Sequence, residues 1–212
     1  MDQFKGLWVS EKALSTGLDP ILKIQGLGWA FRKLAAVATI RLDVSINPED
    51  KSNSASPIVI DTLQTATGGL SGTKEKRVVD WSVQEESNYV NGTTLHQSRF
   101  VHGSTNEDGK LGPDFELQSK VRDEKVRRFL RGEILEDGSS STGFVGAGGL
   151  GEHENVWVHT WERNVKGGWT MERVWGFEEI QGKRYHTRRV VSTNEKGEYA
   201  IARFVYSSVQ KD

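Results

Sequence analysis

The order of the expected elements constrains this 212-residue chain most. Residues 4–8 have the pattern of a short strand, a helical segment occupies about residues 11–36, and strand patterns follow from Val37 onward. One helical segment placed between a first strand and many later strands cannot form a layer over a sheet. We therefore expect it to close one end of a β-barrel, an arrangement that encloses a cavity for a small molecule.

The helical segment itself is predicted to be two short helices. Asp19 is expected to be the N-cap of the first helix, with Pro20 at its first helical position. Gly26 and Gly28 mark its end, and helical spacing resumes at Phe31. These signals predict a helical cap rather than a single long helix.

The rest of the chain is predicted to be antiparallel strands. Tight-turn signals at 166–168, 181–183 and 194–197 join the last four strands into a meander. The fold class predicted is all-β, a single up-and-down barrel domain over residues 1–212 with roughly ten strands. A Gly/Ser-rich tract at about 137–154 is predicted to be a mobile loop. The expected strands are 37–45, 57–67, 76–85, 93–102, 115–122, 126–135, 155–165, 169–180, 184–193 and 199–208.

Composition excludes several classes of function. The net charge of -1 provides no basic field for nucleic acid, and no apolar run is long enough to span a bilayer. The absence of cysteine and of a signal-peptide pattern indicates a cytoplasmic protein. No two histidines have metal-ligand spacing, and Gly143–Gly149 lacks the strand-to-helix context of a nucleotide loop. We therefore expect no metal and no cofactor, and the oligomeric state stays open.

Short motifs at both ends carry a family resemblance. Phe4-x-Gly6-x-Trp8, then Gly26-x-Gly28-x-x-x-Arg32-Lys33, and the closing run 202–209 resemble the intracellular fatty-acid-binding proteins. This resemblance implies a ten-stranded calycin barrel with a helix-turn-helix lid. Over nearly the whole chain the sequence also resembles lipocalin-like proteins of filamentous fungi. The segments that carry this second resemblance are 64–69, 79–81, 168–178 and 183–191.

The sequence differs from the fatty-acid-binding proteins at the residues that bind the carboxylate of the fatty acid. Fatty-acid-binding proteins hold a carboxylate with an arginine two residues before a tyrosine on the last strand. Tyr206 matches that tyrosine, but Phe204 stands where the arginine is expected. Arg203 is three residues from Tyr206 and is expected to face the other side of the strand.

Strand alternation predicts the lining of the cavity. On strand 155–165 two tryptophans flank His159 on one face, and the next strand places Arg173 among large apolar side chains. The alternate face of 169–180, which carries Glu172 and Glu178, is expected to meet solvent. His159, Arg173 and Tyr206 are the predicted catalytic donors. The predicted ligand contacts are Trp81, Trp157, Trp161, Met171, Trp175, Phe177 and Phe204.

Each of these residues has a structural alternative. A tryptophan on a strand is usually packed in the core, and a lone inward histidine is usually a hydrogen-bonded buried group. Arg173 could instead pair with a glutamate on a neighbouring strand. The basic run 126–131 is interpreted as a solvated strand face.

Two functions follow from this pattern. The first is a cofactor-free enzyme that folds a hydrophobic, aromatic or conjugated small molecule and promotes a cyclisation or isomerisation. The resemblance favours this function, because fungal lipocalin-like proteins of this kind include cyclases of secondary metabolism. The second is an intracellular carrier that binds and releases a lipid or another apolar metabolite without chemistry.

Overall fold

The computed structural model describes residues 2–50, 52–53, 55–68, 72–121, 123–146 and 156–209. A 3₁₀ turn at Asp2–Phe4 precedes the first strand, and the helices are α1 (Leu18–Ile24), α2 (Trp29–Val37) and α3 (Glu124–Leu130). The strands are β1 (Gly6–Ser10), β2 (Ile40–Pro48), β3 (Ile58–Ala66), β4 (Thr73–Val78), β5 (Gln84–Asn88), β6 (Gly92–Val101), β7 (Gly103–Thr105), β8 (Leu111–Pro113), β9 (Trp157–Asn164), β10 (Thr170–Ile180), β11 (Lys183–Thr193) and β12 (Tyr199–Val209).

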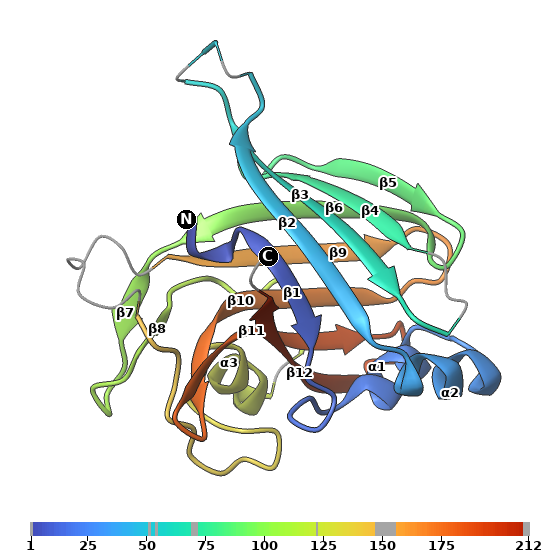
Figure 1. The fold of residues 1–212 in the computed structure, drawn as a ribbon. Coiled ribbons are helices and arrows are strands. Elements are labelled where there is room, and N and C mark those ends of the chain that lie inside the picture. Colours follow the sequence, from blue (N-terminus) through green and yellow to red (C-terminus); the bar gives the residue numbers. More distant parts are fainter. Residues whose placement is uncertain are drawn as a thin grey trace.

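Ten of these strands form one antiparallel sheet that curls into a nearly closed barrel (Figure 1). Their order is β4-β3-β2-β1-β12-β11-β10-β9-β6-β5, so β4 and β5 are the two edges that meet. The Gln84 side chain bridges these edges, because its Oε1 accepts from the Val78 amide at 3.1 Å. The predicted fold class, an all-β calycin-type barrel of ten strands with an N-terminal helical lid, is confirmed.

The lid consists of α1 and α2, which lie together at one end of the barrel (Figure 1). Asp19 is not the N-cap: α1 begins at Leu18 after Gly17, whose φ is 75°. A Cβ at Gly17 would lie 2.3 Å from the Ile201 carbonyl oxygen, so glycine allows the helix to start directly against β12. Asp19 instead accepts a hydrogen bond from Arg32 Nε at 3.1 Å and links the two helices.

Three strand predictions are wrong, one at β4 and β5 and two between β8 and β9. Residues 76–85 are not one strand, because β4 ends at Val78 and a turn leads to β5. Residues 115–121 hold no strand, and 126–135 begins within helix α3. The Asp123 side chain accepts from the Lys125 amide as an N-cap, and the apolar residues Val126, Phe129 and Leu130 follow helical spacing. The run 126–131 is therefore an amphipathic helix with three buried apolar residues rather than a solvated strand face.

Helix α3 and the segments around it cover the outer face of the barrel. Phe129 and Leu130 pack in one cluster with Val174 of β10 and Val191 of β11. The Arg189 guanidinium donates to the carbonyl oxygens of Phe129 at 2.8 Å and Ile134 at 2.6 Å, which anchors the end of α3. The same part of the structure occupies the lower left of Figure 1, away from the lid.

This cover overturns the prediction that one face of β10 meets solvent. Glu172, Val174 and Glu178 are at most 1% exposed. Gly176 lies on the same face, and a Cβ there would lie 2.5 Å from the Phe144 ring. Strands β9–β11 are consequently buried on both faces, which removes the hydrophobic contrast that alternation relies on.

Only part of the predicted Gly/Ser loop can be described. Residues 137–146 pack near α3, and Phe144 forms a bridge with Glu178 and is buried. Residues 147–154 of that tract lie outside the described residues. Across the described part of the chain, each helix is too short or too polar to cross a bilayer.

Phe129→Ala tests whether the outer cover contributes to stability. Phe129 is fully buried, so the substitution should lower the free energy of unfolding by roughly 3–5 kcal/mol through lost transfer energy and a cavity. Urea denaturation followed by tryptophan fluorescence measures this change. Arg127→Ala on the exposed side of the same helix is the control and should change stability by no more than about 0.5 kcal/mol. Equal effects of the two variants would contradict the packing described.

Candidate ligand-binding site

A cavity of about 410 Å³ lies between the lid and the interior of the barrel. The lid contributes apolar side chains to it, including Ile21, Leu22 and Phe31. The opposite wall is polar and comes from four different strands. Its members are Glu75 on β4, Arg173 on β10, Arg188 on β11 and Tyr206 on β12.

Ion pairs hold most of the charges below the cavity. Arg173 Nη2 lies 2.7 Å from Glu162 Oε2, and Arg77 Nη2 lies 3.0 Å from Glu75 Oε2. Arg77 also approaches Glu162 at 3.4 Å, so the four side chains form one continuous network. Burial raises the pKa of the Glu75 carboxyl, but the charges of Arg77, Arg173 and Arg188 outweigh it and bring that pKa to about 2. The Glu75 carboxyl is thus ionised at neutral pH.

Arg188 lines the cavity without a salt-bridge partner among the described residues. Its guanidinium stacks 3.8 Å from the centroid of Trp175 and 5.5 Å from that of Tyr206. The residue is 3% exposed, and its Nε and Nη2 find no hydrogen-bond acceptor within the described structure. Burial lowers the pKa of Arg188 to about 10, which leaves it charged at pH 7. A buried cation with unpartnered donors needs an acceptor, and either water or a bound molecule can supply it.

Tyr206 stands beside this arginine as a second hydrogen-bonding group. Burial raises the pKa of its phenol, although the charges of Arg188 and Arg173 act in the opposite direction. The hydroxyl therefore keeps its proton at neutral pH. Below it, His186 sits among the rings of Phe4, Trp8 and Phe177, and both its ring nitrogens lack a partner among the described residues.

Six predicted site residues face the barrel interior. Met171, Arg173, Phe204 and Tyr206 line the cavity. Trp175 and Phe177 lie deeper, in the apolar cluster with Trp8. Arg173 pairs with Glu162, which was the structural alternative considered for it. The ligand contacts and catalytic roles assigned to these residues stay predictions.

The inward placement of Trp157, His159 and Trp161 is wrong. Arg173 lies opposite Thr160 in the β9–β10 register, so Thr160 and Glu162 face the interior and His159 faces outward. Trp157 packs in the outer cluster with Val174. Large side chains on both faces of β9 made the sequence pattern ambiguous, and the outer cover accounts for the aromatic residues on the outward face.

His159 and Trp81 instead fasten the outer cover to the barrel. His159 Nε2 lies 2.8 Å from Glu172 Oε1, and its Nδ1 accepts from Arg99 Nε at 3.2 Å. Glu172 also accepts from the amide and the hydroxyl of Ser119, each at 2.7 Å. Trp81, at a positive φ of 66°, stacks on the outward-facing His159 ring and so does not line the cavity as predicted. Burial lowers the pKa of His159, despite the contacts with Glu172.

Sequence reasoning missed Arg188, Glu75 and Glu162. Arg188 and Arg189 are adjacent, and alternation alone does not say which of the two faces inward. Pairing β11 against Trp175 would have identified Arg188, because these two residues lie directly opposite each other. Glu75 and Glu162 lie on strands with mixed polar patterns that resemble solvent-facing strands.

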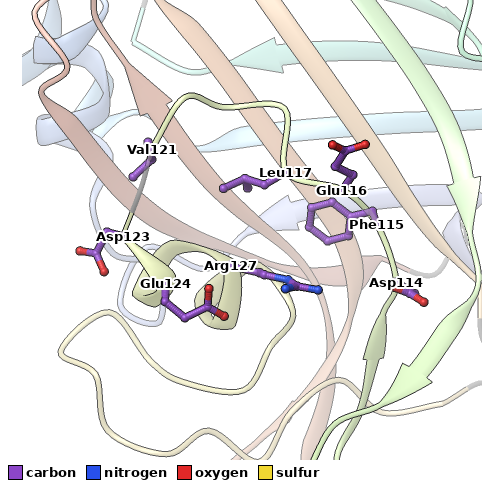
Figure 2. A pocket seen from close by; sticks show the side chains of 8 residues that line it. All are labelled: Asp114, Phe115, Glu116, Leu117, Val121, Asp123, Glu124 and Arg127. Atoms are coloured by element: carbon purple, nitrogen blue, oxygen red, sulfur yellow. The ribbon is translucent and has the colours of Figure 1, made fainter.

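A second pocket, of about 500 Å³, lies outside the barrel between residues 114–121 and α3 (Figure 2). Phe115 and Leu117 form its apolar side, and the Arg127 side chain extends from α3 toward them. Its other charged groups are carboxylates, among them Glu116 and Glu124. Within the described structure none of its polar side chains is both buried and unpartnered, so the barrel cavity is the stronger candidate. The described residues contain no cluster of three or more potential metal ligands.

The chain folds into a ten-stranded barrel like that of the fatty-acid-binding proteins, with an interior that is part aromatic and part charged. Two solved structures resemble it over 99% of this chain: Echinococcus granulosus fatty-acid-binding protein 1, at 11% identity, 100% of that chain and a TM-score of 0.52, and apo Caenorhabditis elegans lipid binding protein 8, at 12% identity, 97% of that chain and a TM-score of 0.54. No family model matches the chain.

The sequence is also similar to that of a fungal protein, a probable pericyclase. The chain is 25% identical over 202 residues to the probable pericyclase scpY of Mollisia scopiformis. That match covers 95% of this chain and 87% of the relative. The resemblance to the fatty-acid-binding fold and to lipocalin-like proteins of fungi is therefore confirmed.

His186 gives the interior a testable pH dependence. Burial, with the nearby charge of Arg188, holds the pKa of His186 well below 6.5. In the unfolded chain this histidine takes up a proton below pH 6.5, so the stability of the folded state falls as the pH drops through that value. Between pH 7 and pH 5 the free energy of unfolding of the wild type should fall by about 2 kcal/mol more than that of His186→Leu. Urea unfolding across this range measures the difference, and parallel profiles would contradict the buried neutral state.

Proposed function

We propose that the barrel binds a hydrophobic, conjugated small molecule that carries an anionic or strongly polarised oxygen. We further propose that it acts on this molecule as a cofactor-free enzyme of secondary metabolism, a cyclase of the pericyclase type or an isomerase. The alternative function is that of a carrier that binds and releases an apolar metabolite. The cytoplasmic location expected from composition stays a prediction.

The observation that supports ligand binding best is the unpaired Arg188. A guanidinium that is 3% exposed and lacks acceptors loses hydration without compensation, so an oxygen-bearing ligand would remove that cost. Trp175 lies beneath the guanidinium, and Phe204 on the next strand offers a flat apolar surface to the cavity. This juxtaposition suits a conjugated molecule with an oxygen at one end.

Hydrogen-bond donors of this kind can accelerate a reaction by stabilising charge that develops in its transition state. Arg188 and the protonated Tyr206 would hydrogen-bond a ligand oxygen and draw electron density toward it as charge develops in the transition state. The apolar lid side chains, Ile21 and Phe31 among them, would hold the chain in a folded conformation and exclude water. The similarity to a probable pericyclase supports this chemistry.

The three predicted catalytic residues do not contribute equally to this proposal. Tyr206 keeps its assigned role as a donor. Arg173 lines the cavity, but Glu162 and Thr160 already occupy its Nη2 and Nε. His159 lies on the outer face with both ring nitrogens hydrogen-bonded, so Arg188 takes the place of His159 as a proposed donor to the ligand.

Binding is tested with 1-anilinonaphthalene-8-sulfonate, an aromatic anion. Arg188→Met should weaken its affinity about tenfold or more, because a charge-assisted hydrogen bond contributes on the order of 1.5–3 kcal/mol. Fluorescence titration measures the affinity. Arg99→Met is a matched control, since Arg99 stacks 4.2 Å from the centroid of Trp81 on the outside of the barrel, and it should leave binding unchanged. Equal affinity of the Arg188 variant and the wild type would count against this binding site.

Turnover separates the enzyme from the carrier. Linear polyene or quinone-methide-like precursors are incubated with and without protein, and the products are resolved by chiral chromatography. For an enzyme, Arg188→Met or Tyr206→Phe should lower product formation by about 10–1,000-fold and lower affinity less, because the donors act mainly on the transition state. If precursors bind but form products at the same rate and with the same stereochemistry with and without protein, the enzymatic function is contradicted and the carrier function is supported.

A further inference from the structure

A third cavity, of about 700 Å³, lies where the barrel edges β4 and β5 meet and is named the gap cavity. Its lining includes side chains that alternate along the strands. Thr62, Glu75 and His96 point to the interior, whereas Lys74 and Lys76 point outward. Side chains from both faces of the wall therefore border this cavity at the gap between the two edges.

Two buried polar groups line this cavity without a partner. Thr62 is 3% exposed and His96 is 2% exposed, and neither Thr62 Oγ1 nor His96 Nδ1 has a hydrogen-bond partner in the described structure. They come from β3 and β6, on opposite sides of the gap. His96 Nε2 lies 3.9 Å from Glu86 Oε2, which is longer than a hydrogen bond.

The charge state of His96 suits the recognition of a neutral oxygen. Burial lowers the pKa of His96 to about 4, and the charges of Arg77 and Arg173 act in the same direction. A neutral imidazole offers one donor and one acceptor, and the Thr62 hydroxyl can serve as either. Glu86 lines the same cavity, and burial raises the pKa of its carboxyl. The Thr62 hydroxyl and the His96 imidazole are thus neutral hydrogen-bonding groups, and charged side chains such as Lys74, Glu75 and Lys76 line the same cavity.

Glu75 belongs to the lining of both the gap cavity and the cavity beneath the lid. The two cavities therefore adjoin at this residue. A fatty acid has one polar end and offers nothing to a second polar region. An occupant with a second oxygen would satisfy Thr62 and His96 as well as Arg188.

We propose that the gap cavity is a second subsite, in which Thr62 and His96 hydrogen-bond a hydroxyl or carbonyl oxygen at the far end of the ligand. The inference rests on the proposed binding function and specifies its substrate class. The ligand is a molecule oxygenated at two separated positions, with an apolar or conjugated stretch between them.

The test compares saturated fatty acids of ten to sixteen carbons with the ω-hydroxy acid of each length, by isothermal titration calorimetry. At the chain length that spans both cavities, the hydroxy acid should bind about fivefold more tightly than its parent, because one hydrogen bond contributes about 1 kcal/mol. In His96→Leu the preference should reverse, since a hydroxyl buried without a partner weakens binding. Thr62→Val is a second variant and should reduce the preference.

His186→Leu is the matched control, because His186 is a buried interior histidine that lines neither cavity. It should keep the preference for the hydroxy acid. If the fatty acids bind in an Arg188-dependent manner but no hydroxy acid is preferred at any length, water fills the gap cavity and the subsite is overturned while the proposed function stands. If neither acid binds while 1-anilinonaphthalene-8-sulfonate still binds in an Arg188-dependent manner, the subsite is overturned and the proposed function stands. If none of the three probes binds, the proposed function and the subsite both fail.

Discussion

The structure depends on how the barrel accommodates charge in its interior. Arg77 and Arg173 share Glu162, and Arg77 also binds Glu75, so each of these buried ions has a partner. Burial of an unpaired ion costs several kcal/mol, so this network lowers the cost of placing these charges inside the barrel. Arg188 is the cation that the network does not include. The geometry that stabilises the interior thereby leaves one guanidinium directed at the cavity.

A second constraint acts from outside the barrel. The segment between β8 and β9 folds over β9–β11, and two buried groups of contacts hold it. Ser119 donates to Glu172, which also contacts His159, and Arg189 donates to the carbonyl oxygens of Phe129 and Ile134. In both groups the sheet contributes residues of its outward face. Strands with two buried faces are held rigidly, which benefits a site whose polar residues must keep fixed positions. The outer cover and the cavity are therefore linked through the same three strands.

The interior chemistry distinguishes this chain from a simple fatty-acid binder. Phe204 occupies the position where the family has an arginine, and Arg188 supplies a cation from the neighbouring strand instead. Arg203 points outward to Glu178 and Glu136, as its spacing from Tyr206 predicted. The cation inside this barrel therefore stacks on Trp175. The proposed conjugated ligand would lie beside this stacked pair.

The sequence by itself determined the barrel, its helical lid, and the inward face of β10 and β12, because local signals such as turns, glycines and period-two alternation specify these features. It did not determine α3, whose apolar spacing fits a helix and whose length also fits a strand, nor the orientation of His159. Both faces of β9 carry large side chains, so its orientation is decided by pairing with β6 and β10. The choice between Arg188 and Arg189 likewise depends on which strand lies opposite. Only the tertiary structure could decide these points, because burial on the outer face depends on a segment distant in sequence that folds over it.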